Sequence, residues 1–231
     1  MYDPLQSDGC RRLPPGLALI FDMDGVIVNS NPLHRESWEI FNRRFGLETT
    51  GAMHEFMYGR RNDEIIRGFF GGGLSTEEVA ARGAAKERLY REMAAGRVES
   101  MLIPGLRRFV ELHRDAPMAV ATNAEPANVE LILERSALAP YFRAIVDGHQ
   151  VERPKPFPDV YLRAADLLGL PPPNCIVFED SRSGVEAARA AGMRVVALLT
   201  THAELPGADL AVRNFLSEEL ETWLGAQSRA V

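Results

Sequence analysis

Short, uninterrupted apolar runs alternate with amphipathic stretches along most of the chain. Apolar runs of this kind are typical of strands that are buried on both faces of a sheet. They occupy residues 17–21, 118–121, 176–178 and 195–199. The helical patterns cover residues 104–114, 126–136, 158–168 and 182–191. This alternation predicts an α/β fold with a parallel, doubly wound, Rossmann-like sheet.

The stretch from residue 33 to residue 101 breaks this alternation, because it contains almost no strand-like apolar run. Its apolar spacing predicts four helices. They are expected at residues 33–45, near His54, at 63–70 and at 76–95, the last with Ser75 as N-cap and Glu78 at capping-box spacing. Trp38, Phe41 and Phe45 fall on one helical stripe and are expected to form an apolar core.

These patterns divide the chain into three parts. We expect an all-helical cap domain at residues 33–101, inserted into a Rossmann-like core formed by residues 17–32 and 102–231. Residues 1–16 are polar and end in Pro14-Pro15-Gly16, which predicts a flexible N-terminal arm.

Composition fits a globular protein and narrows its partners. The 231 residues are 46% hydrophobic and 25% charged, with a net charge of −6, which argues against a nucleic-acid or anionic-membrane partner. Cys10 and Cys175 offer neither a disulfide framework nor a CxxC site. No apolar run reaches membrane-spanning length, and the N-terminus lacks the apolar segment of a signal peptide. We therefore expect a cytoplasmic monomer.

Carboxylates are concentrated directly after the expected strands. In a doubly wound sheet, ligands bind beyond the carboxyl ends of the strands. The polar residues expected there are Asp22, Asp24, Thr122, Asn123, Glu179, Asp180 and Ser181. Four carboxylates this close cannot all remain ionised unaided, and oxygen ligands suit Mg²⁺ rather than zinc. We therefore expect a Mg²⁺ site for phosphoryl chemistry, formed by Asp22, Asp24, Glu179 and Asp180.

Each position suggests a role in that chemistry. Asp22, the first residue after its strand, can act as a nucleophile and form an aspartyl-phosphate. Asp24 can protonate the leaving oxygen and then activate water. Gly25 permits a tight turn whose N–H groups can face a phosphate. Thr122 and Asn123 can donate hydrogen bonds to phosphoryl oxygens or position the substrate.

Lysine is scarce in this chain: of 26 basic residues, only Lys86 and Lys155 are lysines. Lys155 lies in a proline-rich loop that is expected to reach the strand ends. There it can neutralise the nucleophile and the transferring group, a place where the broad fork of arginine is not equivalent.

Four segments resemble the motifs of the haloacid dehalogenase superfamily, in the expected order. They are DMDGV at 22–26, TN at 122–123, KPFPD at 155–159 and FEDS at 178–181. The chain is most similar to the β-phosphoglucomutase-like branch, which also contains many sugar-phosphate phosphatases. The resemblance implies Mg²⁺ held by Asp22, the main-chain carbonyl of Asp24 and Asp180, with Glu179 nearby.

Two cap positions match that branch as well. His34 stands twelve residues after the nucleophile, and Lys86 stands four residues before a tyrosine. The resemblance implies that this pair couples cap closure to the acid/base step. The alternative is that both are solvated side chains on helices. The mutase also has an arginine that grips the distal phosphate of a bisphosphate intermediate, and this chain has Asn62 at that position. Arg60 and Arg61 lie close by and are candidates for contacting the substrate.

Three functions are compatible with these residues. The leading hypothesis is a Mg²⁺-dependent phosphatase acting on a small phosphorylated metabolite, a sugar or polyol phosphate. The second is a phosphosugar mutase of the β-phosphoglucomutase type, motivated by His34 and Lys86. The third is a non-catalytic binding protein on the same scaffold, which predicts a damaged catalytic set, whereas every core motif residue is present.

Overall fold

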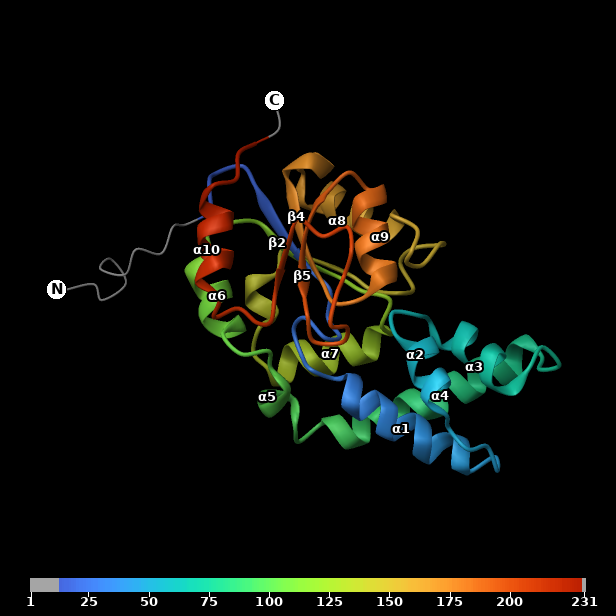
Figure 1. Ribbon diagram of the computed structural model, residues 1–231. Helices are drawn as coiled ribbons and strands as arrows, with labels where there is room; N and C mark the ends of the chain where they lie inside the picture. The colour runs from blue at the N-terminus through green and yellow to red at the C-terminus, as the bar shows by residue number, and fades with distance from the viewer. Residues whose placement is uncertain (1–12, 230–231) are drawn as a thin grey trace.

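A parallel sheet forms the centre of the core (Figure 1). The computed structural model describes residues 13–229, so residues 1–12 of the expected arm lie outside the described part. Within that part the sheet has six strands in the order β3-β2-β1-β4-β5-β6. They are β1 (Ala18–Phe21), β2 (Met118–Ala121), β3 (Ala144–Val146), β4 (Cys175–Glu179), β5 (Arg194–Leu198) and β6 (Leu210–Val212). The predicted parallel α/β fold is confirmed.

The central strand β1 is buried on both faces, as its continuous apolar sequence predicts. Leu19 and Phe21 contribute to one apolar cluster, while Ala18 and Ile20 contribute to the other, because successive side chains of a strand point to opposite faces. β1 pairs with β2 on one side and β4 on the other. The carboxyl ends of these three strands therefore adjoin.

Helices cover both faces of the sheet (Figure 1). The cluster around Phe21 also contains residues of α6 (Leu106–Leu112), α7 (Pro126–Arg135) and α10 (Glu218–Gly225). The opposite cluster contains residues of α8 (Asp159–Leu168) and α9 (Arg182–Ala190). Short 3₁₀ helices span Ala139–Tyr141 and Pro172–Asn174. None of the helices within residues 13–229 is long and apolar enough to cross a membrane.

Some core elements differ from the predictions. The edge strands β3 and β6 and the helix α10 were not predicted. β3 and β6 have three residues each, AIV and LAV, and the middle residue of β3, Ile145, is 36% exposed. Apolar runs this short do not distinguish a strand from a loop. Helix α6 begins at Leu106 rather than Pro104, because Gly105 adopts a left-handed backbone with φ of 86° at the N-cap.

Four helices form the cap, and they have an apolar core of their own. They are α1 (Asn31–Arg43), α2 (Gly51–Met57), α3 (Asn62–Phe70) and α4 (Thr76–Ala94). Their core includes Trp38, Phe41, Ile65, Ile66 and Val79. The predicted capping box is present, since the Ser75 hydroxyl accepts from the Glu78 N–H at 3.2 Å and the Glu78 carboxylate accepts from the Ser75 N–H at 2.8 Å.

At the end of the cap region, helix α5 (Val98–Met101) packs against the core helix α7. Val98 belongs to the core cluster around Phe21. The exact division between core and cap, with its boundaries at residues 33 and 101, stays a prediction.

The predicted aromatic stripe of the cap is buried at two of its three positions. Trp38 and Phe41 are each 1% exposed, whereas Phe45 is 48% exposed. Helix α1 ends at Arg43, so Phe45 lies beyond its last turn and no longer follows the helical stripe. Its ring packs beside Phe41 and Phe70 on the surface.

This difference gives a matched test of the cap core. Phe41→Ala should lower the free energy of unfolding by about 3–5 kcal/mol, because it leaves a cavity in a packed cluster. Phe45→Ala should cost about 1 kcal/mol or less, because its ring is half in solvent. Chemical denaturation followed by tryptophan fluorescence measures both. Equal losses would contradict the finding that Phe41 lies in the cap core and Phe45 on the surface.

Candidate active site

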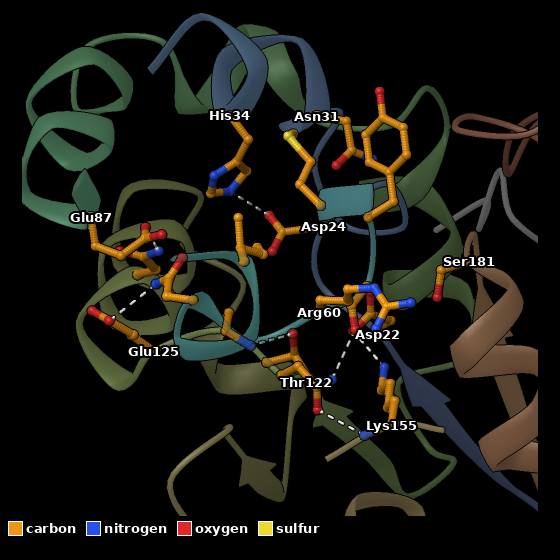
Figure 2. A pocket seen from close by; sticks show the side chains of 18 of the residues that line it. Asp22, Asp24, Asn31, His34, Arg60, Glu87, Thr122, Glu125, Lys155 and Ser181 are labelled. Atoms are coloured by element: carbon orange, nitrogen blue, oxygen red, sulfur yellow. Dashed lines mark hydrogen bonds and ion pairs between the residues drawn. The ribbon is translucent and has the colours of Figure 1, made fainter. Parts of the chain in front are cut away.

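A pocket lies where the cap faces the carboxyl ends of β1, β2 and β4 (Figure 2). The core contributes Asp22, Asp24, Thr122, Asn123, Lys155, Asp180 and Ser181 to its lining. The cap contributes Asn31, His34, Trp38, Arg60, Asn62, Lys86 and Glu87, among others. Most residues expected at the strand ends thus meet in one place, because the strands that carry them are neighbours in the sheet.

A buried lysine connects two carboxylates at the bottom of the pocket. Lys155 Nζ lies 2.8 Å from Asp22 Oδ1 and 2.6 Å from Glu179 Oε1, and its side chain is 2% exposed. Although burial alone lowers the pKa of Lys155, the two carboxylates raise it above its usual value. The lysine is therefore charged, and it holds the Asp22 carboxylate in a fixed orientation.

Glu179 is the anchor of this arrangement. Its Oε1 accepts hydrogen bonds from Lys155 and from the Tyr161 hydroxyl at 2.7 Å. Its Oε2 accepts from the N–H of Asp180 and from the N–H and hydroxyl of Ser181, at 2.8–2.9 Å. Burial raises the pKa of Glu179, but Lys155 and these donors more than offset it and lower the pKa. Glu179 is thus an ionised, fully bonded carboxylate.

Helix α9 comes so close to Glu179 that only glycine fits at its start. A Cβ on Gly184 would lie 1.7 Å from Glu179 Oε1. Neither Gly184 nor Tyr161 was identified from the sequence. Both look like ordinary helix residues there, and only the folded structure brings them to the carboxylate.

Negative charge exceeds positive charge beside Asp22. Ligand atoms of Asp22, Glu179 and Asp180 lie within 4.8 Å of one another. Burial raises the pKa of Asp22 to about 7 even though Lys155 opposes the shift. Burial, together with Glu179 and Asp22, raises the pKa of Asp180 well above its usual value. Buried carboxylates that repel one another in this way fit a hard divalent cation.

Two close approaches keep the proposed cation site compact. Gly25 has φ of 78°, and a Cβ on it would lie 1.8 Å from Asp180 Oδ2, so this turn needs glycine. Asp180 Oδ2 also accepts hydrogen bonds from the Asn31 amide at 3.1 Å and from the Thr201 hydroxyl. Asn31 begins the first cap helix, so this carboxylate is bonded to both core and cap.

Asp24 points toward the cap rather than toward Lys155 (Figure 2). Its Oδ1 accepts from the Ser30 hydroxyl at 2.5 Å and lies 3.4 Å from His34 Nε2. Burial alone raises the pKa of Asp24, but His34 and Ser30 together hold it below its usual value. A second carboxyl group with its own partners thus stands beside the first.

His34 connects Asp24 to the cap helix α4. His34 Nδ1 lies 2.7 Å from Lys86 Nζ, and the imidazole stacks on the Tyr90 ring at 3.8 Å between centroids. An ammonium can only donate, so His34 Nδ1 accepts the hydrogen bond from Lys86, while Nε2 faces Asp24. Lys86 is 1% exposed and also donates to Glu87 at 2.7 Å. The alternative that His34 and Lys86 are solvated side chains is excluded by this burial.

Thr122 and Asn123 lie at the end of β2, as their sequence position predicts. Thr122 is 2% exposed and lines the pocket. The Asn123 amide donates to the Gly59 carbonyl of the cap at 3.0 Å, and its oxygen accepts from the Lys155 N–H at 3.2 Å. Asn123 therefore joins the lysine loop to the cap loop.

The two cap-loop arginines lie in different places. Arg60 lines the pocket, pairs with Glu64 at 3.0 Å and lies over the Phe56 ring. Arg61 is not among the lining residues, and its guanidinium donates to the main-chain carbonyls of Gly148 and Val151 in the core.

Several pocket residues were not identified from the sequence, notably Glu87, Glu125 and Asn128. Glu87 is 3% exposed and accepts from Asn128 at 2.6 Å. The one available signal was the position of Glu87 directly after Lys86, in a stretch that otherwise resembles a solvated helix face.

Comparison with known proteins agrees with this site. A family model described as haloacid dehalogenase-like hydrolase matches residues 17–192. Fructose-1-phosphate phosphatase YqaB of Escherichia coli (strain K12) is 34% identical over 178 residues, covering 77% of this chain and 94% of the relative. Beta-phosphoglucomutase of Bacillus subtilis (strain 168) is 30% identical over 209 residues, covering 88% and 92%.

The fold is shared with solved structures of the same family. The crystal structure of a HAD hydrolase, family IA, variant 3, from Entamoeba histolytica HM-1:IMSS matches with a TM-score of 0.81 and 27% identity, over 91% of this chain and all of that one (100%). The resemblance drawn from the four sequence motifs is confirmed. Because the family model covers most of the chain and the relatives match over most of their length, the chain belongs to the haloacid dehalogenase-like hydrolases.

Proposed function

We propose that the protein is a Mg²⁺-dependent phosphatase that hydrolyses a small phosphorylated metabolite, a sugar or polyol phosphate, through an aspartyl-phosphate on Asp22. The observation that carries the proposal is the geometry of Asp22. Its carboxylate is held by Lys155 at 2.8 Å, in a pocket that Asp24 also lines. The similarity to a protein named fructose-1-phosphate phosphatase supports the substrate class.

The residues that would hold Mg²⁺ are Asp22, Asp180 and the main-chain carbonyl of Asp24, with Glu179 nearby. The excess negative charge shared by Asp22 and Asp180 supports this assignment. Because both oxygens of Glu179 already accept several hydrogen bonds, its main work is to position Lys155. When bound, the ion supplies positive charge that offsets the repulsion between the carboxylates and a phosphate dianion.

In the first step a carboxylate oxygen of Asp22 attacks phosphorus, and the bond from phosphorus to the ester oxygen breaks. Asp24 in its protonated form gives its proton to that leaving oxygen. A phosphate dianion beside Asp24 raises the pKa of this carboxyl group and so favours the protonated form. Lys155 and the Thr122 hydroxyl stabilise the charge that accumulates on the phosphoryl oxygens.

In the second step water attacks the phosphorus of the aspartyl-phosphate. Asp24, now a carboxylate, takes a proton from that water, and the bond between phosphorus and the Asp22 oxygen breaks. Inorganic phosphate leaves and both aspartates return to their starting states. His34 and Ser30 keep Asp24 oriented through both steps.

Contacts between cap and core give the pocket a closed form. Asn123 bonds the Gly59 carbonyl, and Arg61 bonds the carbonyls of Gly148 and Val151. We propose that Arg61 fastens the cap loop to the core. Closure of this kind would exclude bulk water from Asp22 before the ester is broken.

A phosphosugar mutase remains the second candidate, because the contact between Lys86 and His34 at 2.7 Å joins the cap to the acid/base residue. The two functions differ in whether the aspartyl-phosphate passes its phosphoryl group to water or to a sugar. We also retain a cytoplasmic monomer as our proposal, on the sequence features that predict it.

Replacement of the nucleophile tests the mechanism. Asp22→Asn should reduce phosphate release from a sugar-phosphate panel with Mg²⁺ by about a thousandfold or more, because an amide cannot form the acyl phosphate. Asp166→Asn, on the exposed face of α8, is the matched control and should retain full activity. Near-normal turnover by Asp22→Asn would refute the covalent step.

The requirement for a compact ammonium is tested by Lys155→Arg. Turnover should fall by about a hundredfold or more, because a planar guanidinium does not fit the buried space between Asp22 and Glu179. Arg153→Lys in the same loop, at a site 58% exposed, should be nearly silent. If Lys155→Arg were fully active, the site would not need lysine.

The two candidate functions differ in their products. With β-glucose 1-phosphate and a trace of glucose 1,6-bisphosphate, we expect release of inorganic phosphate, measured alongside glucose 6-phosphate. Glucose 6-phosphate formed without free phosphate would establish the mutase instead. If neither inorganic phosphate nor glucose 6-phosphate formed, and no other phosphate ester were converted, the result would support the non-catalytic alternative.

A further inference from the structure

The end of the pocket that faces away from Lys155, called the far end below, contains the carboxylates of Glu87 and Glu125. Figure 2 shows Glu87 and Glu125 on one side of the pocket, with Lys155 and Ser181 on the other. Glu125 follows Thr122 by three residues and is the N-cap of α7. Three residues span at most about 10 Å, so the group that reaches from the phosphoryl site to Glu125 is only a few carbon atoms long.

Two cations at this end, the buried Lys86 and the partly exposed Arg91, already have carboxylate partners. Lys86 donates to Glu87 at 2.7 Å. Arg91 donates to Asn128 at 2.9 Å and lies 3.7 Å from Glu125 Oε2. A second phosphate group placed here would meet two carboxylates. To gain a cation it would have to break one of these pairs, and breaking the Lys86–Glu87 pair leaves a buried charge without compensation.

Glu87 is the more deeply buried of the two acids. Burial alone raises its pKa, but Lys86, His34 and Asn128 outweigh it and lower the pKa to about 2. Its negative charge is therefore fixed at neutral pH.

Arg60, which also lines the pocket, lies on the side of Asp22 in Figure 2 and is paired with Glu64.

The same residues suit hydroxyl groups. Glu125 Oε1 accepts from the Asn62 amide at 3.3 Å, and each carboxylate oxygen can accept two hydrogen bonds. Glu125 can therefore accept further bonds from O–H donors. The Trp38 ring also lines the pocket and provides an apolar surface for C–H groups.

We propose that Glu125, with Asn62 and Asn128, binds the hydroxyl groups of the leaving alcohol and rejects a second phosphate, so that the substrates are monophosphate esters of short, uncharged sugars or polyols. This inference rests on the proposed phosphatase function and specifies its substrate class. It also favours hydrolysis over the mutase reaction, whose bisphosphate intermediate would place a phosphate against Glu125 and Glu87.

Matched esters test the rejection of a second phosphate. We expect kcat/KM for fructose 1-phosphate to exceed that for fructose 1,6-bisphosphate by about a hundredfold, and glucose 1-phosphate to exceed glucose 1,6-bisphosphate similarly. Equal or better turnover of the bisphosphates would overturn the proposal. Hydrolysis of neither ester would instead count against the phosphatase function itself.

Substitutions assign the effect to Glu125. Glu125→Gln keeps the size of the side chain but removes its charge, so the preference for the monophosphate should shrink about tenfold. Asn62→Arg adds a cation beside Glu125 and should shift the preference in the same direction. Glu130→Gln, on the exposed face of the same helix, is the control and should leave the ratio unchanged. An unchanged ratio in both Glu125→Gln and Asn62→Arg would overturn the proposal.

Binding to Asp22→Asn separates this proposal from turnover. Calorimetry with Mg²⁺ should show tighter binding of fructose 1-phosphate than of fructose 1,6-bisphosphate to that variant. The difference should narrow when Glu125→Gln is added. Tighter binding of the bisphosphate would refute the far-end assignment, whatever the activity of the unmodified protein.

Discussion

Burial of one ammonium between two carboxylates is the constraint on which the rest of the site depends. Loss of either partner of such a buried pair typically costs about 3–5 kcal/mol, because a charge is left uncompensated. The surrounding structure accordingly satisfies Glu179 with main-chain N–H groups, a serine and a tyrosine. Gly184 keeps the helix backbone close enough for this arrangement. The orientation of Asp22 is thus set by several elements far apart in the sequence.

The pocket residues of the core and those of the cap are held in position by different interactions. The core residues are fixed by strand ends, whose positions follow from the order of β2, β1 and β4 in the sheet. The cap residues are held by pairs of charges, such as Lys86 with Glu87, and by contacts that cross to the core. In the proposed phosphatase reaction the core residues would therefore carry out the phosphoryl transfer, while the shape and charge of the pocket around Glu87 and Glu125 would select the alcohol.

The sequence predicted the parts of the structure that have local patterns. Strand β1 and the motif residues behind it were predicted because a continuous apolar run ends abruptly in Asp22. The edge strands were missed because each has only three residues with an exposed one in the middle, too short an apolar run to predict a strand. Glu125 and Asn128 were missed for another reason. They become pocket residues only when α4 packs against α7, and these helices are far apart in the sequence, so no local pattern predicts their contact.

The scarcity of lysine has a practical consequence once both lysines are placed. Lys86 is 1% exposed and Lys155 is 4% exposed, and these are the only lysines in the chain. The closed molecule therefore presents almost no side-chain amine to solvent. Amine-directed labels would react with side chains chiefly when the cap swings away from the core, and Lys86 and Lys155 would serve as intrinsic reporters of that movement.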